Sequence, residues 1–251
     1  VLEMGGKNGI IIDKTADFDS AIPEVLDSAF GYQGQKCSAC SNLIVLEDIY
    51  DEFLSRLVES AKSLKVGEAK SPGTDVGPII NKNSYDKIKN YIQMGKKDGR
   101  FLLEGKCEDE KGFYISPTII EVDRDNILAK EEIFGPVLSV LKTKDFDEAM
   151  IIFNSTNYAL TGGIYSRTPS NIEKFLQDAE VGNRYVNRKI TGATVMRQPF
   201  GGFKMSGKGS KAGCSEYLLE FVYQVSNSIN MERSGHVPGI EDFAKHKKFS
   251  N

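Results

Sequence analysis

The sequence contains no tryptophan, four cysteines and two histidines, and it has no long apolar run. So few cysteines in 251 residues exclude a disulfide-stapled scaffold and favour a reducing compartment, where a special thiol is catalytic or metal-binding. No apolar segment approaches the roughly 18 residues that cross a bilayer, and the first residues, VLEMGGKN, lack the apolar core of a signal peptide. These absences predict a soluble protein with no membrane partner.

An excess of charge of either sign is also missing. The 32 basic and 35 acidic residues give a net charge of −3, so no global field attracts nucleic acid or anionic lipid. With 40% apolar and 27% charged residues, the composition is typical of a globular protein of one large or two small domains. We therefore expect no nucleic-acid partner.

Helical and strand-like patterns alternate along most of the chain, which predicts an α/β fold with a sheet covered by helices. Asp17 is a candidate cap for the first helix. The expected helices are 19–32, 48–64, 85–94, 146–153 and 171–179, and the expected strands are 42–46, 101–103, 114–122, 137–141, 162–165 and 182–186.

Residues 187–213 are glycine-rich and lack apolar periodicity, so they predict a long loop of the kind that is usually functional. Gly207, Gly209 and Ala212 match the dinucleotide fingerprint G-x-G-x-x-A, but they do not follow a strand, which favours a plain glycine-rich turn. Residues 218–229 predict a long strand or hairpin arm, and residues 231–251 a polar, irregular tail.

Cys37 and Cys40, in GQKCSAC, leave two chemical alternatives open. A C-x-x-C pair suggests a redox site or half of a zinc site, although no second pair exists and His236 and His246 lie far away in the tail. Alternatively Cys37 is a single nucleophile. It follows a Gly-x-x-Gly loop with Lys36 beside it, a setting in which the pKa of a thiol falls.

Four motifs, LEMGGKN, GQKC, EEIFGPV and QPFGGFKMSG, occur in the order found in the aldehyde dehydrogenase superfamily, which the chain resembles. The interval from Glu3 to Cys37, with GQKCSACSN, NRKITGATVMRQPFGGFKMSG and SKAGCSEYLL, resembles the branch that oxidises L-glutamate γ-semialdehyde, formed from 1-pyrroline-5-carboxylate. Cys214 departs from this branch, which usually has glycine there. The resemblance implies an open, twisted, largely parallel sheet flanked by helices, and proline degradation as the pathway.

The same resemblance assigns roles to individual residues. It implies that Cys37 is the nucleophile and Glu3 the base that activates water, that Glu132 and Phe134 contact the cofactor NAD, and that no metal is needed. The residues that it implies for binding the small-molecule substrate, glutamate semialdehyde, are Ser38, Gly192, Ala193 and Phe200.

The resemblance also predicts a domain organisation. Residues 1–217 are expected to form the catalytic domain and residues 218–251 an oligomerisation strand arm and tail, while the family's N-terminal NAD-binding domain is absent from this chain, so that we expect a fragment of a longer homo-oligomer. The family implies a cytoplasmic location, or the mitochondrial matrix in a eukaryote. Two alternatives stay open: an aldehyde dehydrogenase of another substrate, and a non-catalytic oligomerisation module.

Overall fold

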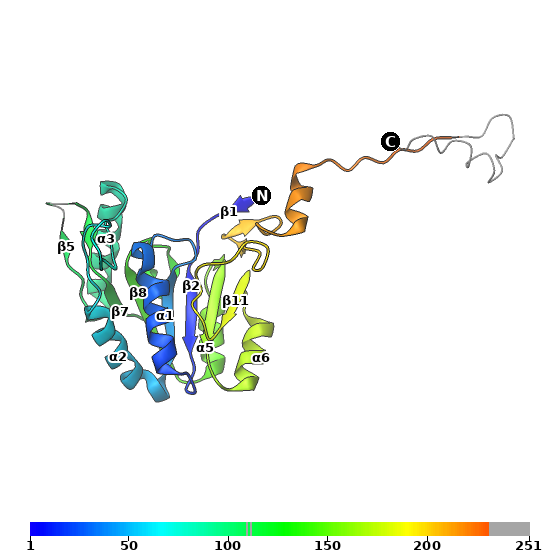
Figure 1. Cartoon of the computed structure of the whole chain (residues 1–251). Coiled ribbons are helices and arrows are strands. Elements are labelled where there is room, and N and C mark those ends of the chain that lie inside the picture. The colour runs from blue at the N-terminus through cyan, green and yellow to red at the C-terminus, as the bar shows by residue number, and fades with distance from the viewer. Residues whose placement is uncertain (109, 111, 231–251) are drawn as a thin grey trace. The chain divides into compact units, whose positions relative to one another are not determined.

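The structure, a computed structural model, describes residues 1–108, 110 and 112–230. The chain divides into a compact unit, Val1–Glu220, and a second unit that begins at Phe221. A seven-stranded sheet in the order β11-β10-β2-β3-β8-β7-β4 forms the centre of the compact unit (Figure 1). All neighbours are parallel except β4, which runs antiparallel to β7. The strands are β2 (Asn8–Ile12), β3 (Cys40–Leu46), β4 (Arg100–Leu103), β7 (Thr118–Glu121), β8 (Val137–Thr143), β10 (Thr161–Tyr165) and β11 (Asn183–Val186).

Helices cover both faces of this sheet (Figure 1). Strand β2 shows the consequence: Ile10 and Ile12 belong to one apolar cluster, and Ile11, between them, belongs to the other. All five residues of β2 are buried, as expected of a parallel strand with both faces covered. The first cluster includes residues of α1 (Phe18–Phe30) and α2 (Tyr50–Lys62); the second includes residues of α3 (Lys82–Asp98), α4 (Ile127–Lys130), α5 (Phe146–Asn154) and α6 (Pro169–Asp178).

Most of the predicted elements are present, and the predicted α/β fold with a largely parallel sheet is confirmed. Asp17 caps α1 by accepting hydrogen bonds from the backbone N–H groups of Asp19 and Ser20 at 3.1 and 3.4 Å. The single strand predicted at 114–122 is wrong: Pro117, which has no N–H to donate, separates β6 (Tyr114–Ile115) from β7. Strand β2 was not predicted from the sequence.

Three short antiparallel strand pairs lie outside the seven-stranded sheet. Strand β1 (Leu2–Glu3) pairs with β13 (Gly207–Lys208), β9 (Tyr158–Ala159) with β12 (Phe203–Lys204), and β5 (Cys107–Glu108) with β6. The segment 187–213 is otherwise irregular, which confirms the predicted long loop. Gly207 lies in β13 and no helix follows directly, so the glycine-rich turn is the correct interpretation of the G-x-G-x-x-A match.

The strand predicted at 218–229 is wrong for the described residues. Ser215–Phe221 forms a 3-10 helix, and residues 222–230 form no helix or strand. The predicted domain boundary after residue 217 falls inside this 3-10 helix. A strand requires hydrogen bonds to a neighbouring strand, and residues 222–230 pair with no described strand of this chain. The predicted tail, 231–251, lies outside the described residues.

No helix among the residues described is long and apolar enough to cross a membrane.

Candidate active site

The candidate nucleophile lies at the edge of the sheet where the parallel strands begin. After α1 ends, the chain passes through Tyr32, Gln33 and Gly34, which have φ values of 56°, 58° and 66°. Two consecutive non-glycine residues in the left-handed region are costly, and such strain is found mainly at functional sites. Gly34 is required here, because a Cβ atom at this position would lie 2.3 Å from the carbonyl oxygen of Gly135. The turn leads to Cys37, which is half-buried just before β3.

Asn8 is the first residue of β2, and its side chain attaches this turn to β2 and to the first residue of β10. Its Nδ2 donates to the carbonyl oxygens of Cys37 and Ala39, both at 2.8 Å, and its Oδ1 accepts from the backbone N–H of Thr161 at 3.0 Å. Asn8 is only 2% exposed, so no solvent would replace these bonds. Gly6 completes the contact, because a Cβ there would lie 2.4 Å from the carbonyl oxygen of Cys37.

Two carboxylates from distant parts of the chain act on the Cys37 thiol. Burial raises its pKa above the usual value, the backbone N–H groups of Ser38 and Cys37 lower it, and the charges of Glu132 and Glu3 raise it further. The net shift is upward, so the predicted fall in the thiol pKa is wrong for this chain. Burial and negative charge outweigh the two amides that face the sulfur.

Glu3 is held by a two-strand contact. In β1 it pairs with Gly207 of β13, and the backbone N–H of Met4 donates to the carbonyl oxygen of Ser206 at 2.9 Å. Its side chain is exposed, as a base that works on water requires. The motifs LEMGG and FKMSGKG, far apart in sequence, thus pair with each other.

Glu132 binds the segment between Glu3 and Asn8. Its Oε1 accepts from the backbone N–H of Gly6 at 2.8 Å. A Cβ on Gly5 would lie 2.4 Å from Oε2 of Glu132, so glycine is needed for the carboxylate to lie over the backbone. Phe134, with φ of 62° and an exposed ring, lies two residues further on.

The four residues predicted to bind substrate lie in two segments. Ser38 is buried next to Cys37, and its carbonyl oxygen accepts from Oγ1 of Thr161 at 3.4 Å. Gly192, with φ of 79°, and Ala193 belong to a loop that the ion pair of Lys189 with Asp27, at 2.7 Å, attaches to α1.

Phe200 is half-buried, and its backbone N–H donates to the carbonyl oxygen of Ala212 at 2.9 Å. The neighbouring Pro199 accepts from Nδ2 of Asn183, the first residue of β11. This anchors the segment at the sheet edge where the parallel strands begin. The roles of Ser38, Gly192, Ala193 and Phe200 as substrate contacts remain predictions.

Cys40 does not behave as a partner for Cys37. Both thiols are free, and Cys40 donates to the carbonyl oxygen of Asn42 inside the apolar core. Burial raises the pKa of Cys40 to about 12, whereas a metal ligand or redox nucleophile must be a thiolate. Within the described part of the chain, no group of His, Cys, Asp and Glu side chains is arranged to hold a metal ion.

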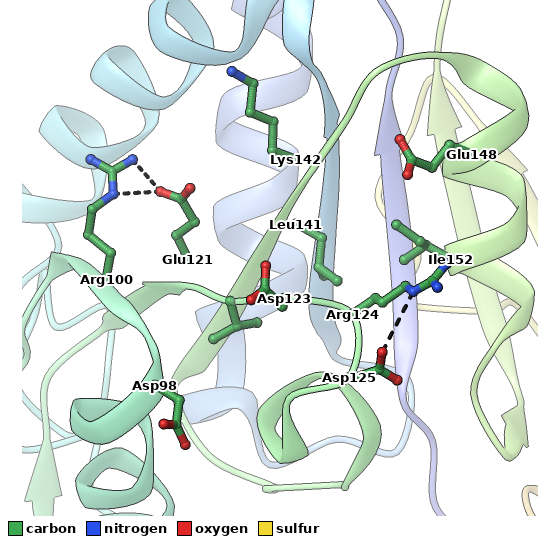
Figure 2. Close-up of a pocket in the computed structure, with 11 residues that line it drawn as sticks. Asp98, Arg100, Glu121, Asp123, Arg124, Asp125, Leu141, Lys142, Glu148 and Ile152 are labelled. Carbon is green, nitrogen blue, oxygen red and sulfur yellow. Dashed lines mark hydrogen bonds and ion pairs between the residues drawn. The ribbon is translucent and has the colours of Figure 1, made fainter.

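A cleft of about 640 Å³ lies away from these residues, where β7 and β8 end. Figure 2 shows its charged side chains: Arg100 is paired with Glu121, and Arg124 with Asp125 at 3.7 Å. Because both arginines of the cleft are in ion pairs, fewer charged groups are available to bind an ionic ligand. The residues that line the cleft include no cysteine, serine or histidine. It is a poor candidate for the chemistry that Cys37 can perform.

Sequence reasoning missed Gly6 and Asn8 as functional positions. The motif GGKN contained the signal, because adjacent glycines before a buried strand indicate close approach of another segment. The sequence does not indicate which segments approach these glycines. In the structure they are the segments that contain Cys37 and Glu132.

We predict that Asn8→Asp destabilises the compact unit and changes the reactivity of Cys37. The aspartate side chain has nearly the shape of asparagine, but its carboxylate oxygens would face two carbonyl oxygens. We expect the free energy of unfolding to fall by about 2 kcal/mol or more. Chemical denaturation measures stability, and the alkylation rate of Cys37 by iodoacetamide in the folded protein measures reactivity. Asn42→Asp is the matched control, because buried Asn42 donates to Ala129 and does not contact the turn. Equal alkylation rates in the two variants would contradict the role assigned to Asn8.

Comparison with known proteins places this geometry in a family. The sequence profile of the aldehyde dehydrogenase family matches residues 1–227. The 1-pyrroline-5-carboxylate dehydrogenase of Geobacillus sp. (strain WCH70) is 51% identical over 220 residues, which cover 87% of this chain and 43% of the relative. The chain thus spans less than half the length of the curated relatives that it matches.

Solved structures agree with this comparison. The 1-pyrroline-5-carboxylate dehydrogenase from Thermus with bound NAD is 48% identical, with a TM-score of 0.85 over 87% of this chain and 42% of that protein. Proline utilization A from Bdellovibrio bacteriovorus, inactivated by N-propargylglycine, is 49% identical, with a TM-score of 0.88 over 95% of this chain and 25% of that protein. Because the family profile matches residues 1–227, this chain belongs to the aldehyde dehydrogenase family.

Proposed function

We propose that this chain is the catalytic part of a longer, NAD-dependent enzyme that oxidises L-glutamate γ-semialdehyde to L-glutamate in proline degradation. The observation that carries the proposal is that one short segment, from Glu3 to Asn8, binds both the Glu132 carboxylate and the turn that contains Cys37. The chain is about half identical to proteins named 1-pyrroline-5-carboxylate dehydrogenase, which supports this substrate.

Cys37 acts first in the proposed reaction. Its thiolate adds to the aldehyde carbon, and the negative charge that develops on the aldehyde oxygen is stabilised by the backbone N–H of Cys37. NAD, when bound, supplies the hydride acceptor that converts the resulting thiohemiacetal to a thioester. Glu3 then takes a proton from water, which attacks the acyl carbon and releases the carboxylate product and the free thiol.

The residues at the site fit a cofactor contact. Glu132 lies over Gly5, where any side chain would displace its carboxylate. One oxygen accepts from the Gly6 amide, and the carboxylate has further capacity to accept from ribose hydroxyls. The exposed ring of Phe134 is available to pack against a sugar or nicotinamide face.

Backbone groups are proposed to bind the amino-acid end of the substrate. The loop containing Gly192 and Ala193 has amides available for an α-carboxylate, and such donors lose little freedom on binding. Ser38 adds a hydroxyl beside the nucleophile, and Phe200 an aromatic surface for the aliphatic chain.

Cys37→Ala in the full-length protein should lower turnover by at least about a thousandfold, because the group that forms the covalent intermediate is lost. NADH formation with glutamate semialdehyde measures it. Cys40→Ala is the matched control and should keep most of the activity, since Cys40 is a buried thiol of the core. Retained turnover in Cys37→Ala excludes Cys37 as nucleophile, and loss in both variants would revive the two-thiol alternative.

The full-length protein should prefer glutamate semialdehyde over propanal by at least about tenfold in kcat/KM. Each hydrogen bond to the charged end of the substrate contributes about 1 kcal/mol or more to transition-state binding. Initial rates over a range of both aldehydes measure the preference. Equal values would indicate an aldehyde dehydrogenase of broader specificity.

A second candidate function is assembly. Seven large apolar residues from the 3-10 helix onward are 58–99% exposed, which is typical of a surface that binds a partner. They are Leu218, Leu219, Phe221, Val222, Tyr223, Val225 and Ile229. We propose that this arm joins copies of the chain in a homo-oligomer.

Sedimentation velocity should show a dimer or a larger species of the chain. The double variant Val225→Lys with Ile229→Lys should shift it toward monomer, because charge then replaces apolar contact area. Ile151→Lys, which changes an exposed isoleucine of α5, is the control and should not alter the distribution. A strict monomer at about 100 μM would count against assembly through the arm.

A further inference from the structure

The turn that contains Cys37 is attached to the rest of the compact unit at two places. Asn8 binds its last part, through the carbonyl oxygens of Cys37 and Ala39. Its first part, 32–35, contains the left-handed residues and is bound by a different segment, 77–80. Neither the proposed reaction nor the sequence motifs explain this second attachment.

Segment 77–80 presents two backbone N–H groups to the turn. The segment forms no helix or strand, so each of its N–H groups needs a partner elsewhere. Pro78 has no N–H to donate, and the N–H of buried Ile79 donates to the carbonyl oxygen of Phe113 at 2.8 Å. The N–H groups of Gly77 and Ile80 remain, and both donate to the turn.

Two glutamine side chains accept these N–H groups. With its amide oriented so that both of its ends have partners, Gln33 accepts from the N–H of Gly77 at 2.8 Å. Oε1 of Gln35 accepts from the N–H of Ile80 at 3.0 Å. Both bonds depend on a side chain that carries an acceptor at this reach, so an apolar residue of the same length would lose them.

The glutamines act where the turn is strained. Tyr32 and Gln33 have left-handed φ values of 56° and 58°, which are unfavourable for residues with a Cβ atom. The amide nitrogen of Gln33 donates to the carbonyl oxygen of Tyr32 at 3.1 Å, and the backbone N–H of Gln35 donates to the same oxygen at 3.0 Å. Strained backbone persists where surrounding contacts support it, and the two glutamines supply such contacts.

We propose that Gln33 and Gln35 are positioning residues for the reaction: by binding segment 77–80 they keep the turn, and with it the sulfur of Cys37, in the place from which it attacks the aldehyde. The inference rests on the proposed function in taking Cys37 as the nucleophile. Because Cys37 follows Gln35 by only two residues, a displacement of this part of the turn also displaces the thiol.

The loop that contains Glu132 has its own attachment to the helix that follows segment 77–80. In α3, the Lys87 ammonium donates to the carbonyl oxygen of Glu132 at 3.2 Å. A Cβ atom on Gly135 would lie 2.5 Å from Cδ1 of Ile88, also in α3. These contacts involve neither glutamine, so we expect the proposed cofactor contact to survive when the glutamine bonds are removed.

The test replaces each glutamine by methionine, which has a similar length but no amide, in the full-length protein. Gln35→Met should lower kcat for glutamate semialdehyde about tenfold, because small misplacements of reacting atoms are costly. Alkylation of Cys37 by iodoacetamide at neutral pH, followed by mass spectrometry, should become at least about threefold faster, because a released turn loses part of the burial that opposes the thiolate. Gln33→Met should change both rates in the same directions.

Cofactor binding separates positioning from a general loss of structure. NADH affinity, measured by fluorescence, should stay within about twofold of wild type in both variants, because the loop with Glu132 keeps its contacts with α3. The alkylation rate of Cys214, a partly exposed thiol outside the turn, should not change. Gln177→Met is the matched control: Gln177 donates to Glu173 on the surface of α6, so kcat and the alkylation of Cys37 should keep their wild-type values.

Three results would overturn the proposal. They are rates within about twofold of wild type in both glutamine variants, equal acceleration of alkylation at Cys37 and Cys214, and a loss of NADH affinity as large as the loss of kcat. Circular dichroism checks that each variant is folded, and if one glutamine variant is not, the other carries the test. The alkylation and NADH measurements need no aldehyde, so failure to oxidise glutamate semialdehyde leaves them unaffected and the two proposals fail separately.

Discussion

The position of Cys37 depends on the hydrogen bonds of the Asn8 carboxamide. The carboxamide uses both donors on the Cys37 turn and its acceptor on the first residue of β10. The strands β2, β3 and β10 are neighbours in the sheet, and this one side chain joins the first residues of β2 and β10 to the turn that leads into β3. Cys37 thus lies in a turn that two side-chain hydrogen bonds attach to the sheet.

Negative charge gathers around this sulfur. Glu3 and Glu132 both oppose ionisation of Cys37, and half-burial adds to their effect. A nucleophile with a raised pKa is less often a thiolate at neutral pH, yet the thiolate that forms is a stronger nucleophile. The segment from Glu3 to Asn8 thus contains the residue predicted to act as the base, the backbone N–H that binds Glu132, and the side chain that binds the turn.

The sequence contained enough information for the fold class, but not for the surroundings of Cys37. The roles of Cys37 and Glu3 were predicted through motifs, although Glu3 alone would pass for a solvated charge, and they stay predictions. Strand β2 escaped prediction because NGIII is short and follows a polar motif. The strand at 218–229 and the fall in thiol pKa were predicted wrongly for a common reason: strand pairing and electrostatic fields depend on residues distant in sequence. Cys37 is affected by Glu132, which local pattern cannot reveal.

The position of the site also departs from a general rule for open α/β sheets. Ligands in such folds usually bind beyond the carboxyl ends of the parallel strands. Here that end holds the large cleft of Figure 2, whose arginines are paired with carboxylates. The reactive groups gather at the amino ends, where Asn8, Cys40 and Thr161 begin β2, β3 and β10. A thiol, a carboxylate and close backbone approach occur together at the amino edge of this sheet, at Cys37, Glu132 and Gly6. Side-chain chemistry therefore locates the site where neither fold topology nor cavity size would.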